Sequence, residues 1–116
     1  APKAVGPYSQ AIEKNGVLFL SGQIPLDPLS GQIVGNTIEQ QTQQIFKNMN
    51  AVLSAAGYSL DDVVKTTVFL TNIDDFATVN AVYGRYFTTE APARSAVAVM
   101  ALPKGAMVEI EAIAIK

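Results

Sequence analysis

Apolar and polar positions in the first third of the chain predict a β-hairpin followed by a long loop. Residues 6–12 lead into Asn15-Gly16, a dipeptide typical of the tight turn between two antiparallel strands. The apolar residues 17–20 follow directly and predict a buried strand that ends at Ser21-Gly22. Proline and glycine recur over residues 23–36, which favours a turn-rich loop in this segment.

The next segment has the spacing of an amphipathic helix. Thr37 and Gln40 match the capping-box pattern, in which a hydroxyl and an amide three residues later satisfy free backbone N–H groups. Gly57 suits the left-handed conformation that commonly follows a helix. Between these ends, apolar residues recur at helical spacing: Ile45, Met49, Val52, Leu53 and Ala56. We therefore predict a helix between Thr37 and Gly57.

The second half of the chain predicts three strands and one further helix. Residues 63–70 are rich in Val, Thr and Phe, which favours a strand. Residues 94–100 and 107–115 predict two more strands, separated by a turn at residues 103–105. The second helix is predicted to begin within residues 72–74. Its broad apolar face carries Phe76, Val79, Val82, Tyr83, Tyr86 and Phe87.

This order of elements predicts an α/β (α+β) fold with a mixed sheet and both helices on one face. Residues 1–116 suffice for a single domain and leave little room for a second. The other face of the sheet is then uncovered. Hydrophobic residues make up 49% of the chain and charged residues only 16%, so we expect self-association to bury that face.

The composition narrows the chemistry that the chain can carry. The sequence contains no Cys and no His, which excludes a thiol nucleophile, a His-ligated zinc site and a serine–histidine triad. We expect no metal and no cofactor, although Asp and Glu oxygens remain as ligands for Mg²⁺ or Ca²⁺. The chemistry available is that of carboxylates, cationic side chains, hydroxyls, amides, backbone and water.

Charge and hydropathy also narrow the range of partners. The net charge of −2 and the pI near 4.9 argue against nucleic acid as a partner. The longest uncharged apolar run, residues 95–103, is far shorter than the roughly 20 residues that span a bilayer. Residues 1–5 lack the apolar core of a signal peptide. We expect a cytoplasmic protein that binds neither nucleic acid nor membranes.

Arg94 is the most informative candidate for a binding residue. The two-residue period of a strand puts it on the same face as Ala96 and Ala98, among small side chains. A guanidinium there is costly to bury without a partner. It either grips a ligand carboxylate through two parallel hydrogen bonds or forms a structural salt bridge with Glu109 or Glu111. The residues alone leave both alternatives open.

Glu109 and Glu111 share one face of the last predicted strand. Either this face starts solvated and becomes buried along the strand, as exposed glutamates usually indicate, or one of the two glutamates is an acid or base that positions water. A tight turn before this strand would put Arg94 opposite a residue near 114, and a longer loop would put it opposite Glu109. The sequence does not decide between these registers, and in an oligomer the two residues could also meet across an interface.

Four other places in the sequence carry groups that can contact a ligand, and each also has a purely structural interpretation. Tyr8 offers a hydroxyl or simple packing, and Asn80 flanks the apolar stripe of the second helix, where its amide faces a pocket or forms a local cap. Ser21-Gly22 ends a strand and offers backbone N–H groups, or is only a bend. Lys65 is a conceivable amine nucleophile, but an exposed lysine on a strand is the simpler interpretation.

Taken together, the motifs resemble the RidA/YjgF family of imine and enamine deaminases over essentially the whole chain. The most specific element is Pro92-Ala93-Arg94-Ser95 with Glu109 fifteen residues after Arg94. The other matching segments are residues 6–10, 20–25, 55–57, 64–69, 76–80, 102–104 and 108–112.

The resemblance implies a chorismate-mutase-like fold and a homotrimer with three ligand clefts between subunits. It implies that Arg94 binds the substrate carboxylate and that Glu109 holds the catalytic water. Further cleft positions are implied at Tyr8, Ser21, Gly22 and Asn80, and at Ala96 through its backbone. Many family members carry Cys where this chain has Ala96, so thiol reactivity is absent here.

The function implied by the resemblance is hydrolysis of 2-iminobutanoate and 2-iminopropanoate, or their enamine tautomers, to 2-oxo acids and ammonia. The implied partners are a small 2-imino or 2-oxo acid and further copies of the chain. One alternative is a trimeric regulatory protein that binds small acids without turnover. A ribonuclease or translation inhibitor is a third, which the acidic balance disfavours.

Overall fold

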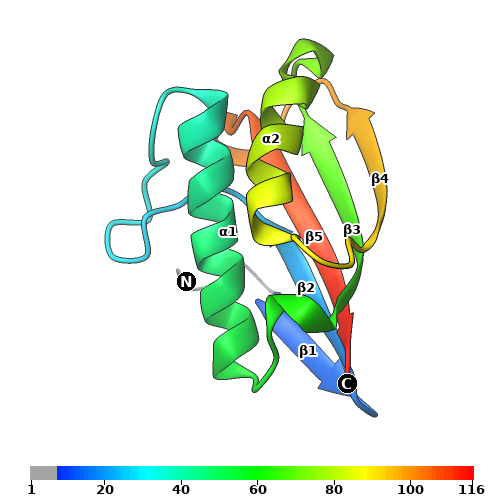
Figure 1. Cartoon of the computed structure of the whole chain (residues 1–116). Coiled ribbons are helices and arrows are strands. Elements are labelled where there is room, and N and C mark those ends of the chain that lie inside the picture. The colour runs from blue at the N-terminus through cyan, green and yellow to red at the C-terminus, as the bar shows by residue number, and fades with distance from the viewer. Residues whose placement is uncertain (1–7) are drawn as a thin grey trace.

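Five strands form one mixed sheet, and two helices cover a single face of it (Figure 1). The computed structural model describes residues 8–116. In chain order the elements are β1 Ala11–Lys14, β2 Val17–Gln23, α1 Ile38–Ala55, β3 Val63–Leu70, α2 Phe76–Tyr86, β4 Ala93–Ala98 and β5 Val108–Ile115. The strands lie in the order β1-β2-β5-β3-β4, with β3 and β4 parallel and the other pairs antiparallel. The predicted fold class is confirmed.

The first hairpin follows from its turn residues. Asn15 and Gly16 both have positive φ angles, 52° and 78°, as a tight two-residue hairpin turn requires. β2 continues to Gln23, past its predicted end at Ser21-Gly22. Phe19 is 48% exposed, so the strand predicted as buried is buried only at alternate positions.

The ends of α1 lie where the sequence predicts them. The Thr37 hydroxyl accepts a hydrogen bond of 3.2 Å from the backbone N–H of Gln40, as an N-cap does. The Gln40 side chain accepts from the Asn36 N–H, so the second half of the predicted capping box is shifted by one residue. Gly57 follows the helix with a φ of 81°, a conformation that a residue with a Cβ adopts only under strain.

The hydrophobic core fills the space between the helices and the sheet. Phe46 of α1 is fully buried and stacks on Tyr86 of α2, with ring centroids 4.4 Å apart. Val108 and Ile110 of β5 are fully buried against the helices, whereas Glu109 between them points to the other face. Burying each such apolar side chain stabilises the fold by roughly 1.5–3 kcal/mol.

The two C-terminal strands pair differently from the prediction. Both predicted registers, which set Arg94 opposite Glu109 or a residue near 114, are wrong. β4 is an edge strand that runs parallel to β3, and Arg94 lies opposite Thr66. β5 lies between β2 and β3. Residues 99–107 carry the chain past the end of β3, so strands that are consecutive in sequence are separated in the sheet.

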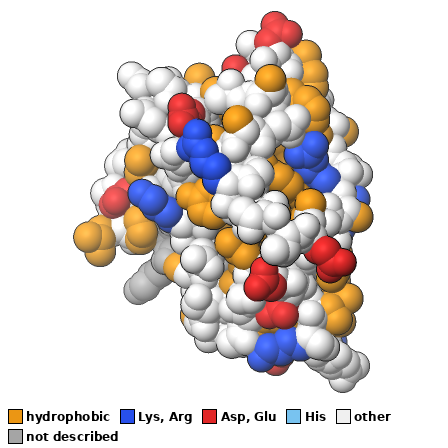
Figure 2. Space-filling model, viewed as in Figure 1, with side chains coloured by type: hydrophobic (Ala, Val, Ile, Leu, Met, Phe, Trp, Pro, Cys, Tyr) orange, Lys and Arg blue, Asp and Glu red, His pale blue; other side chains and the backbone are white. Residues whose placement is uncertain are grey.

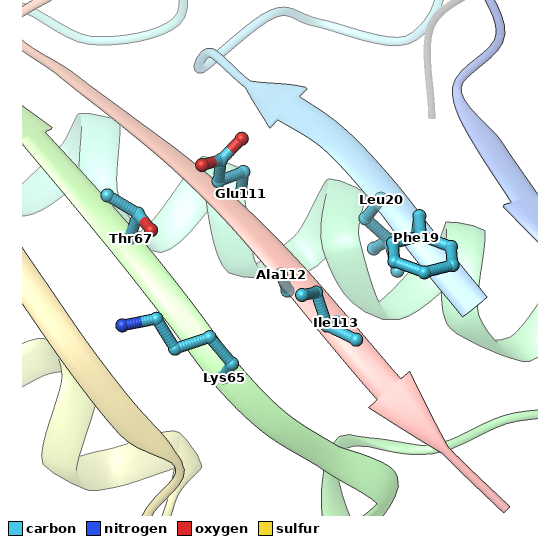
Figure 3. A pocket seen from close by; sticks show the side chains of 7 residues that line it. All are labelled: Phe19, Leu20, Lys65, Thr67, Glu111, Ala112 and Ile113. Atoms are coloured by element: carbon cyan, nitrogen blue, oxygen red, sulfur yellow. The ribbon is translucent and has the colours of Figure 1, made fainter. Parts of the chain in front are cut away.

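The face opposite the helices is uncovered, as predicted, and Figure 3 views the sheet from this side. Three large apolar side chains on it, Phe19, Val97 and Ile115, are 44–48% exposed. A hollow of about 230 Å³ on this face is lined by Phe19, Leu20, Lys65, Thr67, Glu111, Ala112 and Ile113 (Figure 3). Exposed apolar groups around a hollow are typical of a surface that another molecule covers.

Candidate functional site

A single arginine lies on the helix-facing side of the edge strand β4. Arg94 is half-buried, and its Nη1 donates a hydrogen bond of 2.6 Å to Oδ1 of Asn80 in α2. Its guanidinium carbon lies 4.8 Å from the ring centre of Tyr83 and 5.1 Å from that of Phe76. We call these four residues the Arg94 cluster.

The Arg94 cluster follows from the period of α2. Phe76, Asn80 and Tyr83 are four and three residues apart, so they share one face of the helix. Strand alternation turns Arg94 toward that face. Sequence reasoning predicted Asn80 and Arg94 but missed the role of the two rings, although their helical spacing around Asn80 was a usable signal.

Arg94 has no carboxylate partner among the residues that the structure describes. Within residues 8–116 the exposed pair of Arg85 with Glu39, at 3.3 Å, is the only ion pair. Glu109 and Glu111 point to the opposite face of the sheet, so the structural salt bridge to either of them does not form within the chain. In the same residues no buried side-chain nitrogen or oxygen lacks a hydrogen-bond partner, so the other Arg94 N–H groups reach accessible space. The planar guanidinium is therefore held in place by its neighbours, and its remaining N–H groups are available to an anionic group.

Glu109 lines a separate cavity of about 540 Å³, next to β2 and β5. Four predicted site residues, Tyr8, Ser21, Gly22 and Glu109, all contribute to its wall. The remaining lining residues are Ile24, Leu26, Pro103, Lys104 and Glu111. We call this cavity the Glu109 pocket. Its walls combine apolar side chains with one hydroxyl, one phenol, two carboxylates and the ammonium group of Lys104, which suits a small polar ligand.

The Glu109 carboxylate lies directly against Gly22. A Cβ atom at position 22 would overlap with the carboxylate group, so only glycine allows the Glu109 side chain to take this position. The register between β2 and β5 shifts between Leu20 and Gln23, which marks a local irregularity at this point. The Ser21 hydroxyl donates to the Ser9 carbonyl, which leaves the Ser21 oxygen able to accept.

The surroundings of Glu109 favour its protonated form. Burial raises the pKa of the Glu109 carboxyl above its ordinary value, and the negative charge of Glu111 raises that pKa further. A carboxylate with a raised pKa is a stronger base once it is ionised. Glu109 is thus suited to accept a proton from water.

Substituting Gly22 with alanine is expected to displace the Glu109 carboxylate while leaving the fold intact. The overlapping atoms belong to the flexible end of the Glu109 side chain, and Gly22 has no positive φ, so the change in melting temperature should be small. We expect at least a tenfold loss of turnover, since a displacement near 1 Å can cost about a hundredfold.

The matched control for that substitution is Gly84→Ala, in the last turn of α2. A Cβ atom at Gly84 meets nothing within 4 Å, so this variant should keep its activity and gain up to about 1 kcal/mol of stability. Steady-state kinetics and thermal melts of both variants provide the check. A Gly22→Ala variant with normal turnover would contradict the importance of the carboxylate position.

The predicted site residues fall into two groups on opposite faces of one sheet. Arg94, Asn80 and Ala96 belong to the helix-facing side of β4, and Tyr8, Ser21, Gly22 and Glu109 belong to the Glu109 pocket. The fold of one chain does not bring the two groups together.

Lys65 lies on the uncovered face, at the hollow shown in Figure 3. Its Nζ donates a hydrogen bond of 3.0 Å to the Ser95 hydroxyl at an exposed position. This contact fits the simpler interpretation of Lys65 as a solvated lysine.

Two features are absent from the part of the chain that the structure describes. Over residues 8–116, no helix has the length and apolar character needed to cross a membrane. Over the same residues, no group of three or more acidic side chains is arranged to hold a metal ion.

Comparison with known proteins identifies the family. The family model described as Endoribonuclease L-PSP matches residues 1–116. A RutC family protein of Pyrococcus horikoshii is 55% identical over 116 residues, which cover 100% of this chain and 92% of the relative. The 2-iminobutanoate/2-iminopropanoate deaminase of Homo sapiens is 51% identical over 116 residues, which cover 100% of this chain and 85% of the relative. The names of the relatives are mixed and include a regulator in Lactococcus lactis.

Solved structures have the same fold. A protein of unknown function from the Rid family of Yersinia pestis matches with a TM-score of 0.97 and 57% identity, over 100% of this chain and 93% of that one. TdcF of E. coli with bound serine matches with a TM-score of 0.95 and 43% identity, with the same coverage. The sheet with two helices on one face is thus the α+β fold of the RidA/YjgF structures. The chain belongs to the Endoribonuclease L-PSP family, which is the RidA/YjgF family that its motifs resemble.

Proposed function

We propose that this protein hydrolyses short 2-imino acids, such as 2-iminobutanoate and 2-iminopropanoate, to 2-oxo acids and ammonia. The observation that carries the proposal is the Arg94 guanidinium, which is held by Asn80 and two rings and has no carboxylate partner within residues 8–116. Such a fork matches the planar carboxylate that every 2-imino acid has. The 51% identity to the human protein named as this deaminase supports the same reaction.

Glu109 supplies the proton transfers in the proposed mechanism. Starting from the protonated imine, a water oxygen bonds to the imine carbon, the C=N electron pair moves to nitrogen, and the water proton goes to Glu109. Glu109 then passes this proton to the amine nitrogen. The C–N bond breaks, ammonia leaves, and the hydroxyl becomes the carbonyl as its proton is released. Arg94 holds the carboxylate throughout, which keeps the imine carbon next to the water.

We further propose that each cleft combines the Arg94 cluster of one copy with the Glu109 pocket of another, in a homotrimer. The two groups lie on opposite faces of one sheet, and a side chain cannot pass through a sheet. Arg94 is on the edge strand, where a second chain can approach it. Burial of Phe19, Val97 and Ile115 against that chain would stabilise the assembly.

Sedimentation equilibrium at micromolar concentration is expected to give three times the chain mass of 12.3 kDa. The physical reason is the uncovered sheet face, whose exposed apolar side chains lose contact with water on association. A mass equal to one chain would contradict both the trimer and the shared cleft.

The reaction itself is tested by ammonia release. A threonine dehydratase generates the imine in situ, and ammonia is measured with and without this protein, in each case with and without EDTA. We expect faster release with the protein and no loss with EDTA. Release at the background rate would reject the deaminase.

The shared cleft is tested by mixing two inactive variants, Arg94→Ala and Glu109→Gln. After joint unfolding and refolding at equal amounts, each cleft draws its arginine and its glutamate from independent chains. About a quarter of the clefts then carry both intact residues, by random assembly in a cyclic oligomer. Recovery of about a quarter of the wild-type activity is expected, whereas no recovery would mean that both residues act from one chain.

A regulatory protein that binds small acids without turnover is the second candidate, supported by the name of the Lactococcus lactis relative. It would bind 2-oxobutanoate through Arg94 and give no ammonia above background. A ribonuclease is less well supported, because acidic and basic side chains are interspersed on the helix-bearing face, with no broad basic patch (Figure 2), and the net charge is −2.

A further inference from the structure

The position of the Arg94 guanidinium depends on side chains that do not reach a ligand in the proposed mechanism. Within residues 8–116 its one side-chain hydrogen bond, to Asn80, fixes one nitrogen. A single hydrogen bond still allows the plane of the guanidinium to rotate. The ring of Tyr83, 4.8 Å from the guanidinium carbon, provides a surface against which that plane can rest.

Tyr83 is itself held from three sides. The residue is 5% exposed, and its ring contacts those of Phe46 and Phe87 at centroid distances of 5.8 and 4.7 Å. Its hydroxyl forms a hydrogen bond of 2.7 Å with the hydroxyl of Thr66, which is fully buried in β3. Burial raises the pKa of Tyr83, although the Thr66 bond and the Arg94 charge oppose this, so the phenol is neutral at physiological pH.

Thr66, Tyr83 and Arg94 contact one another in sequence and so connect β3, α2 and β4. Thr66 lies directly opposite Arg94 in the register of β3 with β4. The Thr66 hydroxyl holds the Tyr83 hydroxyl, and the Tyr83 ring supports the guanidinium that extends from the residue opposite Thr66. A side chain held in this way loses less rotational freedom when it binds a ligand.

We infer that Tyr83, held by Thr66, is a positioning residue that fixes the plane of the Arg94 guanidinium for a carboxylate. Tyr83 acts through Arg94 and not on the reacting atoms. The inference rests on the proposed function for the identity of the carboxylate. The orientation of Arg94 can be measured without any ligand.

The test uses three variants of the full chain and one control. Tyr83→Phe and Thr66→Val each remove the hydroxyl pair with little change of volume, and Tyr83→Leu removes the ring. The control is Tyr86→Phe, which removes a phenol hydroxyl from the same helix, on a ring that stacks on Phe46. Thermal melts confirm that each variant is folded at the assay temperature.

The first measurement is the order parameter of the Arg94 Nε–H group by NMR, without ligand. We expect a value near the ~0.85 of a rigid group in the wild type and the control, falling toward the ~0.6 of a flexible group in the three variants. Equal order parameters in all five proteins would overturn the inference.

The second measurement is the affinity for 2-oxobutanoate by calorimetry, together with KM and kcat. Tyr83→Phe and Thr66→Val should each weaken binding and raise KM by about three- to tenfold, with kcat within twofold, because the carboxylate contact exists in ground and transition states alike. A fourth variant, which combines Tyr83→Phe with Thr66→Val, should bind no more weakly than either single variant, since both substitutions remove the same hydrogen bond. Unchanged affinity with a lowered melting temperature would show a merely structural role.

The two proposals can fail separately. If the wild type releases no extra ammonia but the order parameter of Arg94 still falls in the variants, the deaminase is rejected and the positioning role is kept.

Discussion

Replacing Arg94 with alanine is expected to abolish turnover and to weaken binding of a 2-oxo acid by about 2–5 kcal/mol, roughly thirtyfold to several thousandfold. In the proposed mechanism the variant loses a bidentate contact with the carboxylate, made by a guanidinium that Asn80 and two rings already orient. Arg94→Lys keeps the charge but lacks the planar fork, so it should not restore binding. Calorimetry with 2-oxobutanoate and the ammonia assay measure both effects.

Arg85→Ala is the matched control for Arg94. Arg85 also lies on the helix-bearing side, but its side chain is 55% exposed and pairs with an equally exposed Glu39. Such a pair contributes about 0–1 kcal/mol, so this variant should retain stability and activity. Because Arg94 has no carboxylate partner within residues 8–116, its loss should lower the melting temperature by only a few degrees. An Arg94→Ala chain that unfolds would show that the residue is structural.

Replacing Glu109 with glutamine is expected to lower kcat by about a hundred- to ten-thousandfold while 2-oxobutanoate still binds. The amide is nearly isosteric, but it cannot accept the proton from water.

In the wild type, activity should fall as pH decreases through the raised pKa of Glu109, because only the ionised form is a base. Steady-state kinetics across pH provide the measurement.

The substitution Glu109→Gln is also expected to change the thermal stability of the protein, in a way that depends on pH. The folded state holds the Glu109 proton to higher pH than the unfolded state does, so this residue lowers the stability of the wild type as pH rises through that interval. Glu109→Gln should therefore melt at a higher temperature than the wild type at neutral pH. The difference should vanish below the ordinary glutamate pKa of about 4.3.

The variant Glu111→Gln distinguishes the role of Glu111 from that of Glu109. Glu111 is exposed, and its negative charge contributes to the raised pKa of Glu109. This variant should keep its kcat, and its activity should extend to a lower pH. If Glu111→Gln abolishes turnover and Glu109→Gln does not, the catalytic role belongs to Glu111.

Features decided by neighbours in the sequence were predictable. The Thr37 hydroxyl caps α1 through a residue three positions away, and the left-handed φ of Gly57 is a property of one residue. The strand over residues 63–70 matches β3 because its β-branched and aromatic residues favour extended backbone. The predicted start of the second helix lies in a 3-10 turn, Ile73–Asp75, which Asn72 caps before α2 begins.

Features decided by distant residues were not predictable. Strand alternation correctly grouped Arg94 with Ala96 and Glu109 with Glu111, but a period of two does not say which side of a strand meets the helices. The position of β4 beside β3 depends on how residues 99–107 bypass the sheet end. Consequently the placement of Arg94 and Glu109 on opposite faces, and the contact of Glu109 with Gly22, required the three-dimensional structure.

In the proposed assembly, the opposite orientation of Arg94 and Glu109 separates folding from catalysis in time. A newly made chain can complete its core and still carry two incomplete sites, so in the proposed assembly it is inert until it meets its neighbours. Activity would then depend on encounter between chains, rising steeply with concentration when chains are scarce and fading on dilution. Enzyme abundance would act as a threshold for imine removal, in addition to setting its rate.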